Sequence, residues 1–98
     1  MRGLTIVLAS ADAGRLRLAV TLAAANAALG GRARLYFSDD AVPALASADL
    51  SLARDSGVEI IACQTGLATA AMALPEGIDA GGPVSMLAEL GDDRLVTL

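Results

Sequence analysis

The chain has 98 residues, the length of one small domain, and we expect residues 1–98 to fold as a single unit. Its net charge is −4, with seven scattered arginines and no lysine, so it lacks the cationic stripe that a nucleic-acid-binding surface needs. With no histidine and one cysteine, it has no internal disulfide, CxxC redox pair or cysteine-rich metal site, and we expect no metal, no cofactor and no nucleic-acid partner.

The first third of the chain predicts a strand and a long helix. Leu4–Ala9 is a near-continuous apolar run, typical of a strand buried on both faces of a parallel sheet. Asp12 is a good N-cap, and the helix that it begins should continue to Leu29 and end at Gly30-Gly31. The apolar positions that recur along this helix at helical spacing are Leu18, Leu22, Ala25 and Leu29. We expect this stripe to face the core.

The middle of the chain predicts two more strands and three short helices. Ala33–Phe37 should be the second strand, followed by a short helix with Pro43 in its first turn. A weak helix over residues 50–56 leads into the third strand, Val58–Ala62. A helix over residues 66–73 should follow, with Thr65 as its cap.

The last quarter predicts a loop, a short helix and a final strand. Residues 75–83 form a loop rich in glycine and proline, and a minimal strand near residues 82–84 could lie only at a sheet edge because of Pro83. A helix over residues 85–90 precedes the last strand, Arg94–Leu98. This alternation predicts an α/β fold with a mostly parallel, doubly wound sheet of four or five strands.

Three polar loops follow predicted strands, and the carboxyl ends of parallel strands share one edge, where α/β folds bind their ligands. Cys63 lies in the third loop, directly after the most strand-like segment of the chain. The candidate binding residues of the three loops are Ser10, Asp12, Ser38, Asp39, Gln64, Thr65 and Gly66. We therefore expect these side chains to surround the thiol.

Cys63 is the one side chain suited to covalent chemistry near neutral pH. A helix N-terminus after the cysteine would favour a thiolate, and the amide groups of residues 64–66 could bind the anion. The alternative is a buried structural cysteine that acts as a small hydrophobic side chain. Position alone leaves both interpretations open.

The aspartates of these loops are more simply interpreted as helix caps than as catalytic or metal-binding residues. Asp39 and Asp40 could hold a metal or act as a base, but aspartates after a strand usually cap the next helix or form a turn. Asp12 invites comparison with phosphoacceptor aspartates, but those sites need a lysine, which this chain lacks. Capping is therefore the favoured role for all three.

The order of several segments resembles the DsrE/DsrF-like family, which includes YchN-like and TusD-like proteins. The resemblance spans nearly the whole chain. The segments that carry it are Leu35–Val42, a strand that ends in an aspartate before Ala-Val; Ser56–Cys63, a Gly-Val strand that ends in cysteine; and the closing segments Leu87–Leu90 and Asp93–Leu98. The chain is shorter than larger members and has no second cysteine near Cys63.

The resemblance implies a Rossmann-like or flavodoxin-like three-layer sandwich and a role in sulfur relay. In sulfur-relay members, the cysteine that matches Cys63 carries a persulfide between a donor and an acceptor protein. The first hypothesis is thus a small sulfur-carrier or sulfurtransferase-like subunit. The runner-up is a non-catalytic oligomeric module that binds a small ligand at the strand ends, and a third is a structural or regulatory partner.

The apolar excess of the chain predicts self-association. Hydrophobic residues make up 55% of the chain but aromatic residues only 2%, so a small domain must hide much small aliphatic surface. We expect a homo-oligomer, and the resemblance favours a trimer or hexamer. The longest apolar stretch, Leu18 to Leu29, is shorter than the roughly 20 residues of a membrane span, and no signal-peptide pattern is present. We therefore expect a cytoplasmic protein with a reduced thiol and no membrane partner.

Overall fold

A parallel sheet of five strands, in the order β4-β3-β2-β1-β5, forms the centre of the protein, and the computed structural model describes all of residues 1–98. All four strand pairs are parallel, which confirms the predicted α/β fold. In chain order the elements are β1 (Leu4–Leu8), α1 (Ala13–Ala28), β2 (Ala33–Phe37), the 3-10 helix η1 (Asp39–Ala46), α2 (Leu50–Asp55), β3 (Glu59–Cys63), α3 (Gln64–Thr69), β4 (Asp79–Gly81), α4 (Pro83–Ala88) and β5 (Arg94–Thr97).

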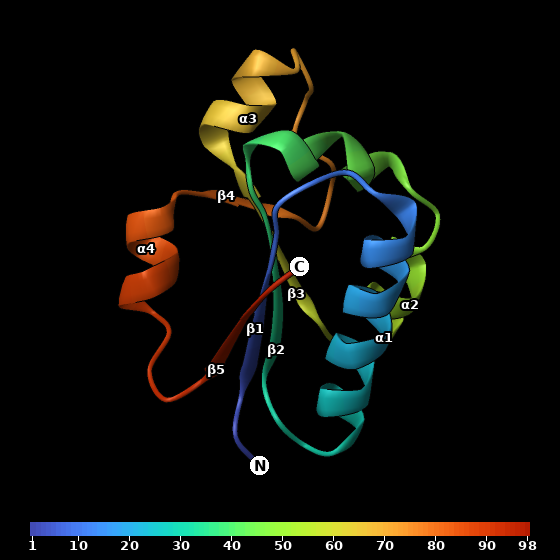
Figure 1. The fold of residues 1–98 in the computed structure, drawn as a ribbon, viewed down its shortest axis with the longest axis vertical. Coiled ribbons are helices and arrows are strands. Elements are labelled where there is room, and N and C mark those ends of the chain that lie inside the picture. The colour runs from blue at the N-terminus through green and yellow to red at the C-terminus, as the bar shows by residue number, and fades with distance from the viewer.

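The helices cover the two faces of the sheet unequally (Figure 1). Helices α1 and α2 lie on one face, α4 alone lies on the other, and α3 stands beyond the carboxyl ends of the strands. The chain moves from β1 outward to β4 and then returns through α4 to β5 on the other side of β1. The result is a three-layer sandwich whose third layer is one helix of six residues.

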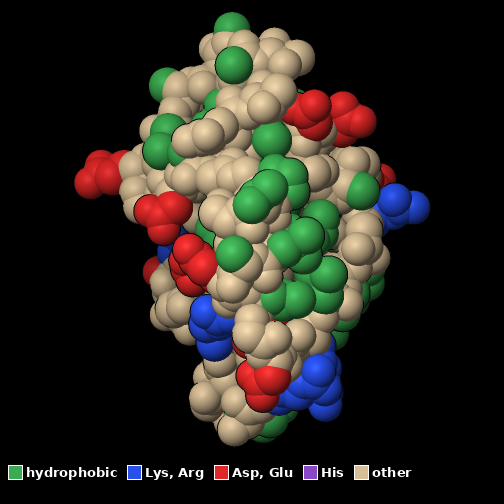
Figure 2. Space-filling view, turned by 90° about the vertical axis from the view of Figure 1, so that its left-hand side faces the viewer, with side chains coloured by type: hydrophobic (Ala, Val, Ile, Leu, Met, Phe, Trp, Pro, Cys, Tyr) green, Lys and Arg blue, Asp and Glu red, His purple; other side chains and the backbone are tan.

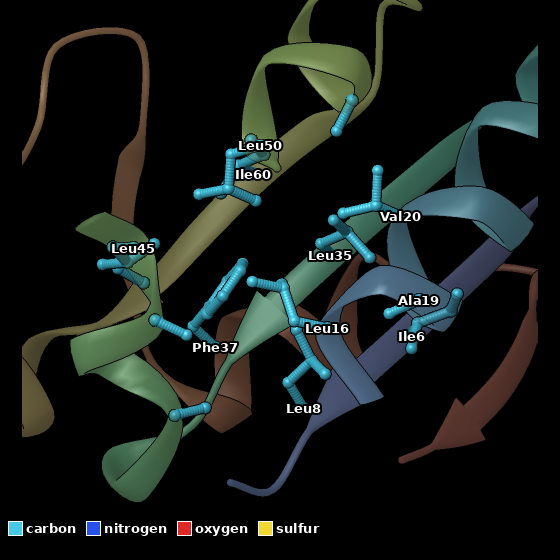
Figure 3. Close-up of a cluster of buried hydrophobic side chains, with 14 of the residues drawn as sticks. Ile6, Leu8, Leu16, Ala19, Val20, Leu35, Phe37, Leu45, Leu50 and Ile60 are labelled. Carbon is cyan, nitrogen blue, oxygen red and sulfur yellow. The ribbon is translucent and has the colours of Figure 1, made fainter. Parts of the chain in front are cut away.

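The main core lies between the sheet and α1 (Figure 3). Alternate residues of the strands point to this side, among them Ile6 of β1 and Phe37 of β2, and all of their surface is buried. From α1, Leu16 and Val20 pack onto them, each 2% exposed. Burial of each such side chain contributes roughly 1.5–3 kcal/mol, so this contact dominates the stability of the domain.

The prediction of which side of α1 faces the core is wrong. Leu18, Leu22 and Leu29 are 49%, 40% and 67% exposed, and Ala25 is exposed as well. The buried side of α1 is formed instead by Leu16, Ala19, Val20, Ala23 and Asn26. Both sets have helical spacing, and the buried set carries small alanines that allow the helix to approach the sheet closely.

Several element boundaries differ from the sequence expectation. Helix α3 begins at Gln64 with Cys63 as its N-cap residue, so Thr65 lies in its first turn and does not cap it. The edge strand β4 comes before Pro83, at Asp79–Gly81, and Pro83 opens α4, where its missing N–H has no cost. Pro43 lies in the middle of η1 and not in its first turn, because η1 begins at Asp39.

A buried arginine fastens α4 to the open face of the sheet. Arg34 of β2 is 0% exposed, and its Nε donates to Thr5 Oγ1 at 3.0 Å. One terminal nitrogen donates to the Met86 carbonyl of α4 at 3.3 Å. The other, Nη1, has no hydrogen-bond partner and lies 3.8 Å from a carboxylate oxygen of Glu89.

Asp93 supplies the buried countercharge of this network. Its Oδ2 accepts from Arg32 Nη2 at 2.7 Å and from Thr5 Oγ1 at 3.1 Å, and lies 3.8 Å from Arg34 Nε. Its carboxylate sits against Gly3, where any Cβ would overlap the Oδ1 oxygen. A side chain at position 3 would therefore force the Asp93 carboxylate to shift from its place beside the arginines.

No helix of the protein combines the length and the apolar character that a membrane crossing requires.

Candidate functional site

Cys63 is the last residue of β3 and the residue that turns the chain into α3. Its backbone is extended, as the N-cap position requires, and α3 begins at the next residue. The side chain is half-buried and contacts both hydrophobic clusters of the domain. The sulfur is therefore at the carboxyl edge of the sheet, as predicted, and is neither fully exposed nor sealed in the core.

Tyr36 of β2 is the polar neighbour of Cys63. In the register of β2 and β3, Tyr36 pairs with Ile61, so Cys63 lies one pleat further along the same face. Such a diagonal pair is within reach of a long aromatic side chain. Cys63 packs against the small cluster that contains Tyr36, and the tyrosine is only 3% exposed.

The surroundings of Tyr36 keep its hydroxyl protonated. Burial is the largest cause and raises the pKa of Tyr36 from 10.0 to about 12. The nearby Cys63 and, last, the charge of Asp39 raise this pKa further. The hydroxyl is thus protonated throughout the neutral and mildly alkaline pH range.

Gly66 explains how α3 and Asp39 come together. A Cβ at Gly66 would lie 3.0 Å from the Asp39 Cα, 3.1 Å from its carbonyl oxygen and 2.8 Å from a Val42 methyl group. Helix α3 therefore rests directly on the backbone of η1. The predicted residues Gly66 and Asp39 do lie at the Cys63 site, Gly66 as a packing position and Asp39 as a nearby charge.

Two other predicted residues of the site lie further away. Ser10 and Asp12 follow β1, which is separated from β3 by β2. Asp12 Oδ2 accepts from the Arg15 amide at 2.9 Å, so it is the N-cap of α1 as predicted. Ser10 Oγ accepts from the Asp12 amide at 3.4 Å. Both side chains serve the turn between β1 and α1.

The remaining predicted residues flank the thiol without a bond to it. Ser38 Oγ donates to the Leu8 carbonyl at 2.6 Å and so links the ends of β2 and β1. Gln64 and Thr65 are exposed residues of the first turn of α3. Ser38, not Asp39, is the N-cap residue of η1, and its side chain forms no capping bond. The expected capping role of Asp39 and Asp40 is thus not observed.

The expected amide contacts at the sulfur are not observed. The Cys63 side chain forms no capping hydrogen bond with the amides of α3. Its neighbour on the same face of the sheet is Tyr36, a residue that sequence reasoning placed in a strand without a role. The signal that could have found it is the alternation of β2 and β3, because it puts every second residue of neighbouring strands on one face.

Neither a hollow nor a metal site accompanies the thiol. The three surface hollows of the chain, of about 290, 230 and 140 Å³, lie between α1 and α2, along α2, and between α4 and the β3–β4 edge. None is lined by Cys63. No group of three or more cysteine, aspartate and glutamate side chains is arranged to hold a metal ion.

No family model matches the chain, and no curated protein matches it.

Proposed function

We propose that the protein is a small sulfur-carrier or sulfurtransferase-like subunit that accepts sulfane sulfur on Cys63. The observation that supports this most directly is the place of the only thiol, half-buried at the carboxyl end of β3 where α3 begins. The sulfur is not sealed in the core, so a reactant can approach it from the edge of the sheet. The resemblance to DsrE/DsrF-like proteins points to the same residue.

The proposed reaction needs no oxidant and no metal. The Cys63 thiolate attacks the terminal sulfur of a donor persulfide, R–S–SH, and a new S–S bond forms at Cys63. The bond between the donor's two sulfurs breaks, and the donor leaves as the thiolate R–S⁻. The products are Cys63–S–SH and R–S⁻, and the same step in reverse delivers the sulfur to an acceptor thiolate.

The absence of a hollow at Cys63 favours a carrier over the alternative, a module that binds a small ligand at the strand ends. The three hollows lie elsewhere on the chain, so one chain offers no enclosed pocket for a free ligand beside the sulfur. A half-exposed thiol can instead be reached by a persulfide on the surface of another protein. Donor and acceptor proteins are therefore the proposed partners, in the cytoplasm, where thiols stay reduced.

Self-association is the second proposed interaction. Parallel sheets are normally covered on both faces, yet α4 is the one helix on its side of this sheet. Figure 2, which looks at that side, shows hydrophobic side chains gathered in the middle of the face. Leu95 of β5 shares this face through its pairing with Thr5, and Leu95 is exposed. Further copies of the chain would cover this surface, and the resemblance favours a trimer or hexamer.

Mass spectrometry after incubation with a low-molecular-weight persulfide tests the proposed function. The wild-type protein should gain the mass of one sulfur atom, which a thiol reductant then removes, and Cys63→Ser should gain nothing. Because Cys63 is the only cysteine, the adduct has one possible site. A protein that alkylates normally but gains no sulfur from this donor would favour the non-catalytic module.

A further inference from the structure

We propose that the exposed leucine stripe of α1 binds the same stripe of a second copy of the chain, with the two helices antiparallel about a two-fold axis. The stripe consists of Leu18, Leu22, Ala25 and the C-cap residue Leu29, all of which are exposed. This contact goes beyond the self-association proposed above, because it uses the α1 layer and not the side of the sheet on which α4 lies.

Helix α1 has two apolar sides, and the chain covers only one of them. The core side, which includes Leu16 and Val20, points to the sheet (Figure 3). Helix α2 flanks a second side, where Arg17 and Thr21 line the hollow between the two helices. Because each residue turns the helix by about 100°, the leucine stripe lies about a third of a turn from both of these sides. Its three leucines are accordingly 40–67% exposed.

The stripe has the spacing of a contact between two helices. Its positions are separated by four, three and four residues, the repeat by which apolar side chains of two α-helices interdigitate. Single exposed leucines are ordinary on a protein surface, but a row of three along one helix marks an interaction surface. The same spacing explains why the stripe resembles a core side in the sequence.

The stripe is complementary to itself when two copies run antiparallel. A two-fold axis through its midpoint puts Leu22 opposite the partner's Ala25 and Leu18 opposite the partner's Leu29. A large side chain then meets a small one at the centre, as the packing of knobs into holes requires. In a parallel pair each residue would face its own copy, and two small alanines would leave the centre poorly filled.

Arg15 favours the same antiparallel direction. It lies three residues before Leu18 on the same stripe, is exposed and has no ion pair within the chain. Antiparallel packing puts its guanidinium beside the C-terminal end of the partner's α1, the negative end of the helix dipole, where the last turn has no basic residue of its own. Arg32, the next cation beyond that end, is already paired with Asp93. A parallel pair would bring two Arg15 side chains together.

Disulfide cross-linking tests the contact and its direction. Leu18→Cys and Leu29→Cys are each made in a Cys63→Ser chain, so that each protein has one thiol. After mild oxidation, a mixture of the two proteins should form a covalent dimer that contains one copy of each, and neither protein should dimerise alone. In the antiparallel pair the two copies of residue 18 are about 16 Å apart along the helices, which is too far for a disulfide. No cross-link in the mixture, or a dimer of Leu18→Cys with itself, would overturn the proposal.

Sedimentation at several protein concentrations measures the strength of the contact. Leu22→Glu puts an unpaired carboxylate at the centre of the contact in both copies, so the association should weaken about a hundredfold. Leu74→Glu replaces a leucine that is also exposed but lies outside the stripe, and its association should match the wild type. Equal association in the wild type and Leu22→Glu would contradict the proposal and leave the stripe to a different partner.

Arg15→Gln gives a test by the sign of its effect and does not disturb the core, because Arg15 is exposed. Two contacts between a guanidinium and a helix end are lost, so the antiparallel pair should dissociate about three- to thirtyfold more readily. Tighter association of Arg15→Gln would mean that the arginines repel each other in a parallel pair, against the proposal. None of these measurements involves a persulfide, so a failed sulfur transfer leaves this inference standing, and the reverse also holds.

Discussion

Tyr36 on β2 and Cys63 on β3 face the same side of the sheet one pleat apart, and Cys63 packs against the cluster that contains the tyrosine ring. The two residues are 27 positions apart in the chain, the difference between 63 and 36, and the parallel register alone brings them together. The tyrosine is buried at this position, so its ionisation affects the stability of the fold.

We expect the protein to lose stability in strong base because of Tyr36. Burial, with Cys63 and Asp39 in support, raises the pKa of Tyr36 to about 12 in the folded protein, against 10.0 as its ordinary value. The folded state thus binds its proton more tightly than the unfolded state does. The stabilisation of the folded state by this proton is fully present below pH 10 and is lost as the pH rises through about 12. The free energy of unfolding from urea titrations should fall by up to about 2 kcal/mol over this range.

Tyr36→Phe is the matched control for the alkaline effect. Phenylalanine keeps the ring and cannot ionise, so the free energy of unfolding of this variant should be nearly flat between pH 10 and pH 12. The chain has no lysine, so no lysine titration obscures the comparison. Equal losses in the wild type and the variant would show that Tyr36 is not the titrating group.

Gly66→Ala should damage the contact between α3 and η1. The added methyl would meet the backbone of Asp39 at 3.0 Å and Val42 at 2.8 Å, so one of the two helices must shift. We expect a loss of about 1–3 kcal/mol in the free energy of unfolding. The alkylation rate of Cys63 should also change, because α3 begins at the residue that follows Cys63.

Gly82→Ala gives the control for this prediction. Its Cβ would meet no atom within 4 Å, and its φ of −129° suits any residue. The free energy of unfolding and the alkylation rate of Gly82→Ala should stay close to wild type. If Gly66→Ala also keeps the stability and the alkylation rate of the wild type, α3 does not pack closely against the backbone of η1.

Substitution of Asp93 should be much more destabilising than substitution of Arg34. Asp93→Asn removes the negative charge shared by two arginines and leaves Arg34 buried without a countercharge, so we expect a loss of about 3–5 kcal/mol. Arg34→Met removes a cation whose Nη1 has no hydrogen bond and leaves Asp93 paired with Arg32. Its free energy of unfolding should stay within about 1 kcal/mol of wild type.

The order of the two effects is the decisive result. Both variants can be measured by urea unfolding at neutral pH. Arg34→Met could instead lose more stability than Asp93→Asn. In that case the hydrogen bond from Arg34 to the Met86 carbonyl would stabilise the attachment of α4 by more free energy than the burial of the arginine charge costs.

Much of the fold could be predicted because its signals are local. Apolar runs bounded by glycine, aspartate and serine give all four major strands, and Asp12 correctly begins α1. The position of Cys63 at a strand end follows from the same pattern. Boundaries near Thr65 and Pro83 were displaced by a few residues, because strand and helix ends depend on hydrogen bonds that the sequence does not display.

The partners of the site could not be predicted because they depend on register. Neither the pairing of Tyr36 with β3 nor the burial of Arg34 has a signal within its own segment. Arginine in a strand is ordinarily read as a solvent-facing residue, and its countercharge Asp93 lies 59 positions away, the difference between 93 and 34. Such contacts follow only from the three-dimensional order of the strands.

The α1 helix provides the sharpest test of where sequence reasoning failed. Leu16 lies on the buried side at 2% exposure, whereas Leu22, which belongs to the expected stripe, is 40% exposed. Leu16→Ala should therefore lower the free energy of unfolding by about 2–5 kcal/mol, and Leu22→Ala should change it by less than about 0.5 kcal/mol. Urea unfolding at several protein concentrations measures both and reveals any contribution from self-association. If Leu22→Ala were the costlier change at every concentration, α1 would face the sheet through the stripe that its sequence first suggests. A cost that appears only at high concentration would instead place Leu22 in contact between copies of the chain.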